Sequence, residues 1–284
     1  MRFIAVIALA CLACGRAWSG LLEEVVQLPV EVRDIHHRTH QHRIIVTIWR
    51  DDERGSSPFL VLNHGRAGSA ERRAKLGRAR YTANARYFVA QGFAVFVPTR
   101  VGYGVTGGPD VEYSGPCARR NFSGAFDAGV AQTIAVIELA KAQPYVDGTR
   151  GLLVGQSFGG AITVALASKN PKGILGAINF AGGSGGDPER KPDSPCSESV
   201  LRNLFGAYGK TSRIPAAWLY SENDRYWGRD NPRAWHETFR SAGGVAEFVQ
   251  LPAFRADGHA SFTGNPEAWR PEVEKFLASL NVVK

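Results

Sequence analysis

A serine flanked by glycines directly after a short apolar run is the feature of this sequence that most suggests chemistry. Ser157 lies in the segment Gly155-Gln156-Ser157-Phe158-Gly159, after residues 152–154 (Leu-Leu-Val) and before an Ala- and Val-rich stretch. This is the G-x-S-x-G pattern between an expected strand and an expected helix, the context in which it indicates a nucleophile elbow. The glycines let strand, turn and helix come close together. The pattern therefore predicts acyl transfer with Ser157 as the nucleophile.

A serine hydroxyl is a weak nucleophile at neutral pH and needs a base, usually a histidine oriented by a carboxylate. In an open α/β sheet these groups should follow strands, in the chain order serine, acid, histidine. His259, in a loop after the last expected strand, is the predicted base, because His236, the other histidine after Ser157, falls within an expected helix. Asp224 lies four residues beyond the expected strand 216–220 and is the predicted acid.

Three other acidic residues are weaker candidates for the acid. Glu222 follows the strand at once, where turn acids usually face water. Asp257 is too close in sequence to His259 to hold its ring easily. Asp147 precedes the elbow strand, at the opposite end of the sheet, and is expected to pair with Arg150 in a turn.

Acyl transfer also needs two N–H groups aimed at the developing oxyanion. The Phe158 amide, directly after the nucleophile, is predicted to supply one. The other is expected from the loop after the strand at 59–62, from the Arg66 amide or failing that from Ala67, because Gly65 allows a close backbone approach. A simple His-Gly turn is the alternative interpretation of this loop.

The elements that must position these residues alternate between apolar strands and helices. Short loops between such elements favour an α/β fold with a mostly parallel central sheet and helices on both faces. Residues 181–212, rich in Gly, Pro, Asp and Ser, are predicted to form a long loop or small lid with one short helix at 198–208. No repeat or linker divides residues 20–284, so one domain is expected. Strands are expected within 25–49 and at 59–62, 93–97 (stopped by Pro98), 152–154, 174–180, 216–220 and 246–251, and helices at 74–91, 123–142, 232–242 and 266–280.

Residues 1–19 are expected to be a secretory signal peptide. Met1-Arg2 provides the positive start, residues 3–13 are apolar but too short to span a bilayer, and residues 17–19 (Ala-Trp-Ser) offer a cleavage site. A lipoprotein anchored through Cys14 is the alternative. The mature chain is thus predicted to be exported, either periplasmic or secreted, without stable membrane insertion.

Removal of the signal peptide would leave two cysteines, Cys117 and Cys196. An even pair in an exported protein favours a disulfide, with two unpaired thiols as the alternative. His36, His37, His40 and His42 resemble a metal-binding cluster, but no carboxylate nearby has a suitable spacing, so these histidines are expected to be solvated and no metal is predicted.

The net charge of +8 does not indicate nucleic-acid binding. The arginines are scattered, and no basic block alternates with aromatic residues. The densest charged stretch, residues 71–80, is expected to be the solvated face of a helix.

These motifs together resemble the α/β-hydrolase superfamily, and within it the exported serine members of the dienelactone hydrolase-like group. The resemblance implies a Ser157-His259-Asp224 triad, no cofactor and a small-molecule ester substrate. Dienelactone hydrolases proper carry a cysteine nucleophile, so the serine here favours a general carboxylic ester over dienelactone itself. The matching segments cover about residues 59–262 in the family's order: Asn63-His64-Gly65-Arg66, Arg100-Val101-Gly102-Tyr103-Gly104, Val146-Asp147-x-x-Arg150, Gly155 to Gly160, Asn223-Asp224 and Gly258-His259.

Two other functions stay open. The segment 100–104 also resembles prolyl oligopeptidase-type peptidases, so a peptidase or amidase is the main alternative, although the chain is too short for the propeller or large cap that such enzymes usually add. A non-catalytic binding protein is less favoured, because it has no reason to keep all three triad residues.

The expected strand ends also suggest what surrounds the triad. Tyr103, Tyr226 and Trp227 are expected near these ends, where they would line the substrate pocket, with plain packing as the alternative. A Cys117–Cys196 disulfide would tie the glycine-rich loop to the segment 181–212 and shape the pocket mouth.

Overall fold

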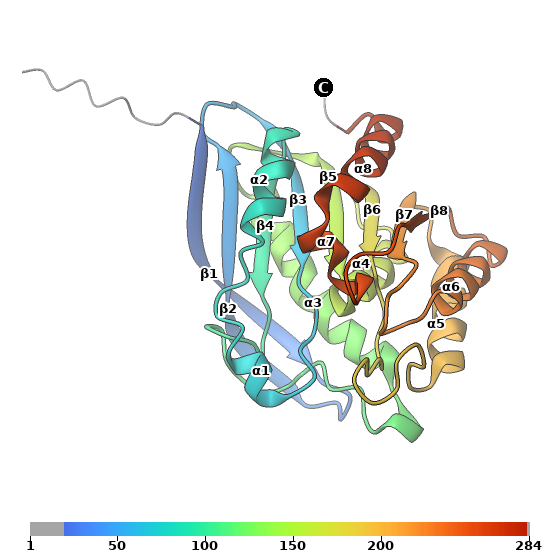
Figure 1. The fold of residues 1–284 in the computed structure, drawn as a ribbon. Helices are drawn as coiled ribbons and strands as arrows, with labels where there is room; N and C mark the ends of the chain where they lie inside the picture. The colour runs from blue at the N-terminus through green and yellow to red at the C-terminus, as the bar shows by residue number, and fades with distance from the viewer. Residues whose placement is uncertain (1–19, 283–284) are drawn as a thin grey trace, which may run out of the picture.

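Apolar stretches from along the whole described chain come together in one eight-stranded sheet (Figure 1). The structure, a computed structural model, describes residues 20–282, so the expected signal peptide lies outside the described residues. The strand order is β1-β2-β4-β3-β5-β6-β7-β8. The pairs β1–β2 and β2–β4 are antiparallel and all other pairs are parallel. The strands are β1 (Leu21–Arg33), β2 (Thr39–Asp51), β3 (Ser57–Asn63), β4 (Ala94–Thr99), β5 (Val146–Gln156), β6 (Ile174–Phe180), β7 (Ala216–Ser221) and β8 (Ala246–Leu251).

Helices cover both faces of this sheet, as the sequence predicts. Helices α3 to α6 contribute to one apolar cluster and α2, α7 and α8 to the other, and Figure 1 shows the second group in front of the strands. The α-helices are α1 (Ala70–Ala74), α2 (Thr82–Ala90), α3 (Phe122–Lys141), α4 (Phe158–Ala167), α5 (Glu198–Thr211), α6 (Asp230–Ser241), α7 (Ser261–Gly264) and α8 (Pro266–Leu280), with 3-10 turns η1 (Cys117–Arg119) and η2 (Gly258–Ala260).

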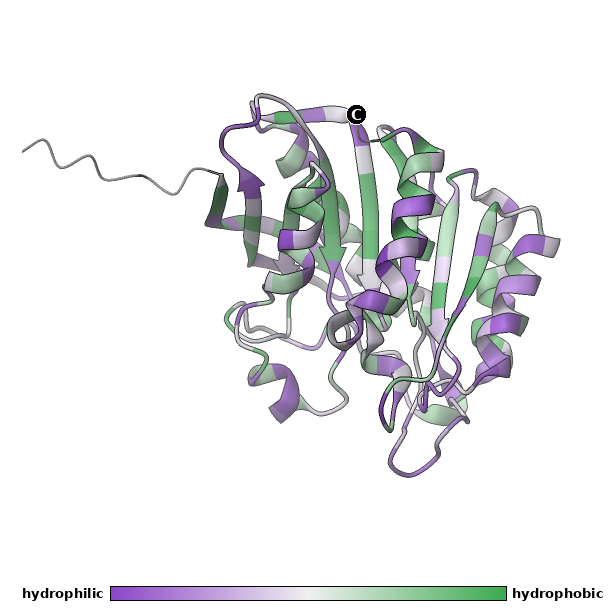
Figure 2. Ribbon diagram, turned by 45° about the horizontal axis from the view of Figure 1, so that its top comes forward, coloured by the Kyte–Doolittle hydropathy of each residue, from purple (hydrophilic) through white to green (hydrophobic). Residues whose placement is uncertain are grey.

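Strand β3 illustrates why the central strands are continuously apolar. Successive side chains point to opposite faces of a sheet, and here both faces are covered. Phe59 and Val61 therefore pack in one cluster, whereas Leu60 and Leu62 pack in the other, and all four are fully buried. Burial of each such side chain contributes about 1.5–3 kcal/mol. Figure 2 shows the resulting pattern, with hydrophobic central strands between helices that carry hydrophilic residues on their outer faces.

The region around residues 74–91 differs from the sequence prediction. Instead of one helix, α1 ends at Ala74 and α2 begins at Thr82, with a turn between them. Gly77 (φ +69) and Tyr81 (φ 46) adopt left-handed backbone conformations, which interrupt a helix. Arg73 is also buried and pairs with Asp110 at 3.0 Å, so this stretch is not simply a solvated helical face.

Strand β4 includes Pro98, although the strand was predicted to stop before it. Pairing with β3 stops at Phe96, while pairing with β2 continues to Thr99. Pro98 thus lies where β4 has only one neighbouring strand, a position in a sheet that tolerates a missing N–H.

The four N-terminal histidines divide into two groups. His36 and His37 are exposed, as predicted, but His40 bonds to Asp34 through Nε2 and Oδ2, 2.9 Å apart, and His42 bonds to the Thr106 carbonyl at 2.8 Å. Asp34 is thus the nearby carboxylate that sequence spacing did not reveal. Within residues 20–282, no group of three or more potential ligands could hold a metal ion. None of the helices in this range is long and apolar enough to cross a membrane.

Candidate active site

Ser157 occupies the sharp turn between β5 and α4. Its backbone has φ 55 and ψ −123, a conformation that L-residues rarely adopt and that costs on the order of 1–3 kcal/mol. Surrounding bonds hold it there: its N–H donates to the Phe180 carbonyl at 2.9 Å, and its carbonyl accepts from Ala161 and Gly183. Such stored strain at a single polar residue is typical of functional sites.

Two glycines allow this turn to form. A Cβ at Gly155 would collide with the backbone of Gly159, and a Cβ at Gly159 would collide with the carbonyls of Asn63 and His64. Helix α4 therefore starts in direct contact with both its own strand and the loop after β3. A Cβ at Gly65 would lie 3.2 Å from the Ser157 Cβ, so this loop also borders the serine.

His64 fixes the peptide group between Gly65 and Arg66. The Arg100 backbone N–H donates to His64 Nε2 at 3.1 Å, so Nε2 is the acceptor and the ring proton resides on Nδ1, 2.7 Å from the Gly65 carbonyl. Burial, together with the charge of Arg100, holds the pKa of His64 well below its usual range, so the imidazole ring stays neutral. Because the peptide is trans, the Arg66 N–H points to the side opposite the Gly65 carbonyl.

Asp224 and His259 come together from loops 35 residues apart in the sequence. Asp224 Oδ2 lies 2.9 Å from His259 Nδ1, and the Asp224 side chain is fully buried while His259 is 12% exposed. The other carboxylate oxygen, Oδ1, accepts from the backbone N–H groups of Tyr226 at 2.9 Å and Trp227 at 3.3 Å. Each oxygen of the carboxylate thus has a nitrogen partner, which fixes the orientation of the Asp224 side chain.

Hydrogen bonds connect the two loops that carry Asp224 and His259. The Asn223 side-chain amide donates to the Arg255 carbonyl and its oxygen accepts from Phe254 N, while the Gly258 N–H donates to the Asn223 carbonyl. Asp257 accepts from the backbone N–H of His259 at 3.0 Å. Asp257 therefore holds the backbone of this loop and makes no hydrogen bond to the imidazole ring.

The remaining acid candidates occupy their predicted positions. Glu222 is exposed. Asp147 pairs with Arg150 at 2.6 Å, as predicted. His236, on α6, bonds to the Ala246 carbonyl at 3.2 Å, away from the loop of His259.

A buried ionic network, which sequence reasoning missed, lies beneath the loop after β3. Arg100 and Glu112 form a fully buried pair, and Arg100 also donates to the His64 carbonyl at 2.8 Å. The Arg66 guanidinium makes two bonds to Asp110, at 2.7 and 2.6 Å. Asp110 and Glu112 stand in a glycine-rich loop without periodicity, so nothing in the sequence signalled their partners.

The three aromatic residues expected to line the pocket differ in exposure. Tyr103 is 1% exposed and donates its hydroxyl to Glu112 at 2.7 Å, so it belongs to the ionic network. Trp227 is 2% exposed and donates to the Ala181 carbonyl. Tyr226 is half-buried and stacks on the His259 ring, with centroids 3.9 Å apart, and so remains the best placed to meet a ligand.

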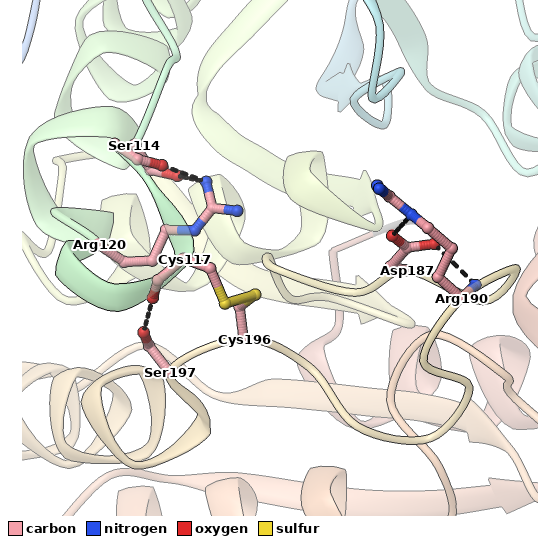
Figure 3. Close-up of a disulfide and its surroundings, with 8 residues drawn as sticks. Ser114, Cys117, Arg120, Asp187, Arg190, Cys196 and Ser197 are labelled. Carbon is pink, nitrogen blue, oxygen red and sulfur yellow. Dashed lines mark hydrogen bonds and ion pairs between the residues drawn. A yellow bond between two sulfur atoms is a disulfide. The ribbon is translucent and has the colours of Figure 1, made fainter.

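Cys117 and Cys196 form a disulfide, which confirms the predicted pairing (Figure 3). Cys117 begins η1 and Cys196 ends the loop before α5, so the bond ties the glycine-rich loop to the segment 181–212. Ser197 reinforces the junction by donating to the Cys117 carbonyl at 2.6 Å. The segment 181–212 consists of an irregular loop followed by α5, which is longer than the short helix expected at 198–208.

We expect replacement of both cysteines by serine to lower the free energy of unfolding by about 3 kcal/mol. The bond closes a loop with a sequence separation of 79 residues, and its loss would free the unfolded chain from that restraint. Urea unfolding of the oxidised wild type and the double variant measures the difference. A change below about 1 kcal/mol would contradict a structural role for this disulfide.

The mostly parallel sheet, the strained serine after β5 and the acid and histidine after β7 and β8 define an α/β hydrolase. A family model described as the alpha/beta hydrolase family matches residues 59–282, and the chain belongs to that family. No curated protein shows significant sequence similarity to the chain.

Several solved structures share the fold at low sequence identity. Acetyl xylan esterase 1 from Thermoanaerobacterium sp. is 12% identical with a TM-score of 0.60, covering 92% of this chain and 88% of its own. A cold-adapted esterase from an Arctic intertidal metagenomic library is 19% identical with a TM-score of 0.59, over 93% and 95%. A dienelactone hydrolase-like promiscuous phosphotriesterase from metagenomic libraries is 17% identical with a TM-score of 0.58, over 92% and 99%. At these identities the likeness shows the fold alone.

Proposed function

We propose that this protein is a serine hydrolase that cleaves carboxylic esters, with Ser157 as nucleophile, His259 as general base and Asp224 as the acid that orients the base. The observation that carries this proposal is the strained serine at the end of β5, whose neighbour Gln156 bonds to the backbone of His259 while His259 bonds to Asp224. Fold neighbours that are esterases support the choice of an ester substrate.

The reaction proceeds in two half-reactions. His259 Nε2 takes the Ser157 proton as Oγ bonds to the ester carbonyl carbon, and the tetrahedral intermediate then expels the alcohol, which takes the proton from His259. Water, deprotonated by His259, attacks the acyl-enzyme and releases the carboxylic acid and free Ser157. Asp224 holds the Nδ1 proton and stabilises the imidazolium that forms in each half.

The Phe158 and Arg66 amides are the proposed oxyanion donors. Phe158 N–H is one of the free amides at the start of α4. The Arg66 N–H belongs to the peptide group whose carbonyl His64 holds, in a loop whose Gly65 borders Ser157. Preorganised donors of this kind contribute about 2.7–4 kcal/mol each to transition-state stabilisation.

The loop 181–197 is proposed as a wall of the substrate pocket, in the role of a small lid. Gly183 and Gly186 lie against the Trp227 ring, close enough that a Cβ at Gly186 would be 2.8 Å from it. Trp227 in turn lies edge-on to His259, with centroids 5.4 Å apart. The disulfide that anchors this loop also supports an exported protein, because such bonds persist in oxidising compartments.

Two assays on the purified mature protein test this function. We expect wild type to hydrolyse short-chain p-nitrophenyl esters, and a fluorophosphonate probe to add one adduct that intact mass and peptide mapping place on Ser157. Ser168→Ala, at the far end of α4, is the matched control and should label like wild type. Labelling without ester turnover would favour a peptidase or amidase. No labelling at Ser157 would overturn the proposed mechanism and favour a binding protein.

A further inference from the structure

Tyr81 adopts a left-handed backbone conformation next to the candidate site. It precedes α2 with φ 46 and ψ 42, a strained geometry for a bulky residue, and its side chain makes no capping bond to the helix. The ring is half-buried and packs against Phe262, with centroids 5.8 Å apart. The hydroxyl is directed to Gln156, whose Oε1 lies 2.9 Å away.

Gln156, the residue before Ser157, makes hydrogen bonds through both the oxygen and the nitrogen of its side-chain amide. The His259 carbonyl can only accept, so Nε2 faces it, 3.4 Å away, and Oε1 therefore faces Tyr81 and accepts from its hydroxyl. Burial raises the pKa of Tyr81 to about 12, although the nearby Gly65 backbone and the charge of Arg100 oppose this rise. The hydroxyl thus stays protonated at neutral pH and can keep donating to Gln156.

These bonds connect three separate segments. Tyr81 belongs to the turn before α2, Gln156 to the turn that presents Ser157, and His259 to the loop after β8. The side-chain amide of Gln156 accepts from the Tyr81 hydroxyl on one side and donates to the His259 backbone carbonyl on the other.

We propose that Tyr81 and Gln156 are positioning residues that hold the turn that presents Ser157 and the loop that carries His259 in register. This inference rests on the proposed function and adds to it two residues outside the triad and the oxyanion donors. Neither side chain reacts with substrate. A displacement of about 1 Å between reacting groups is enough to lower a rate by about a hundredfold, so loss of this link should reduce the chemical step.

The test compares variants by steady-state hydrolysis of p-nitrophenyl acetate. Tyr81→Phe keeps the ring against Phe262 and removes only the hydroxyl, and we expect kcat to fall about tenfold with KM within about twofold of wild type. Gln156→Met removes both bonds at nearly constant length, and we expect a fall of about thirtyfold or more in kcat. The double variant should equal Gln156→Met alone, because that change already breaks the Tyr81 bond.

Tyr87→Phe is the matched control. Tyr87 lies on α2 and its hydroxyl bonds to Glu274 at 3.3 Å, a contact with no link to Ser157. Its loss should leave kcat unchanged. Thermal unfolding of each variant shows whether the fold survives: a purely structural role would lower the midpoint and leave kcat and KM of the folded fraction unaltered.

The outcomes separate this inference from the function on which it rests. If wild type is active, Ser157→Ala is inactive and Tyr81→Phe retains full kcat, the positioning role is wrong and the proposed function stands. Additive effects of the two changes would also overturn the link between them. If wild type shows no turnover that depends on Ser157, the proposed function fails, and the positioning role fails with it.

Discussion

Replacement of Ser157 by alanine is expected to reduce kcat for p-nitrophenyl acetate by about a millionfold, to the residual rate that oxyanion donors and binding alone can support. The variant loses the only atom that forms the acyl-enzyme, while Phe158 and Arg66 keep their amides. Alanine has the same Cβ as serine, so it neither relieves nor increases the strain at φ 55. We therefore expect the thermal midpoint to stay close to that of wild type.

Glycine at the same position separates activity from strain. Ser157→Gly should be equally inactive, but its freedom at positive φ should make the fold more stable than wild type by about 1 kcal/mol. Urea unfolding of wild type, Ser157→Ala and Ser157→Gly measures this order. If Ser157→Ala kept more than about one per cent of the activity, Ser157 would not be the nucleophile.

The sequence was most informative where local chemistry and periodicity agree. The strand at 246–251 and the helix at 266–280 match the structure at both ends, because an apolar pattern and a Pro266 start define them locally. The Asp224–His259 contact was also foreseeable, since the ends of neighbouring parallel strands meet at one edge of the sheet. The disulfide followed from the count of cysteines that the signal peptide would leave.

Long-range polar contacts could not be predicted from local sequence patterns. Tyr81 and Gln156 are 75 residues apart, and Arg66 and Asp110 are 44 apart, with no periodicity to connect either pair. The helix expected at 74–91 was wrong for a different reason. Gly77 and Tyr81 adopt left-handed backbone conformations, which interrupt a helix between α1 and α2.

Asparagine in place of Asp224 is expected to lower kcat by about ten thousandfold, through the tautomer of His259. The backbone N–H groups of Tyr226 and Trp227 point at one oxygen of the native carboxylate, so the asparagine must turn its own oxygen toward them. Its NH₂ then faces His259 Nδ1, which has to act as acceptor. The ring proton is forced onto Nε2, and that nitrogen can no longer take the proton of Ser157.

Two further variants make this result specific to Asp224. Glu222→Gln, two residues away and exposed, should keep kcat within about twofold of wild type, because surface changes of this kind rarely disturb a site. Asp224→Ala should also be impaired, but it leaves Nδ1 free to carry its proton, so we expect it to be no slower than the isosteric asparagine. Measured kcat values for the three variants show whether the loss of activity is specific to Asp224. If Glu222→Gln lost as much activity as Asp224→Asn, the acid would have been assigned to the wrong residue, and the bond between Asp224 and His259 would be structural only.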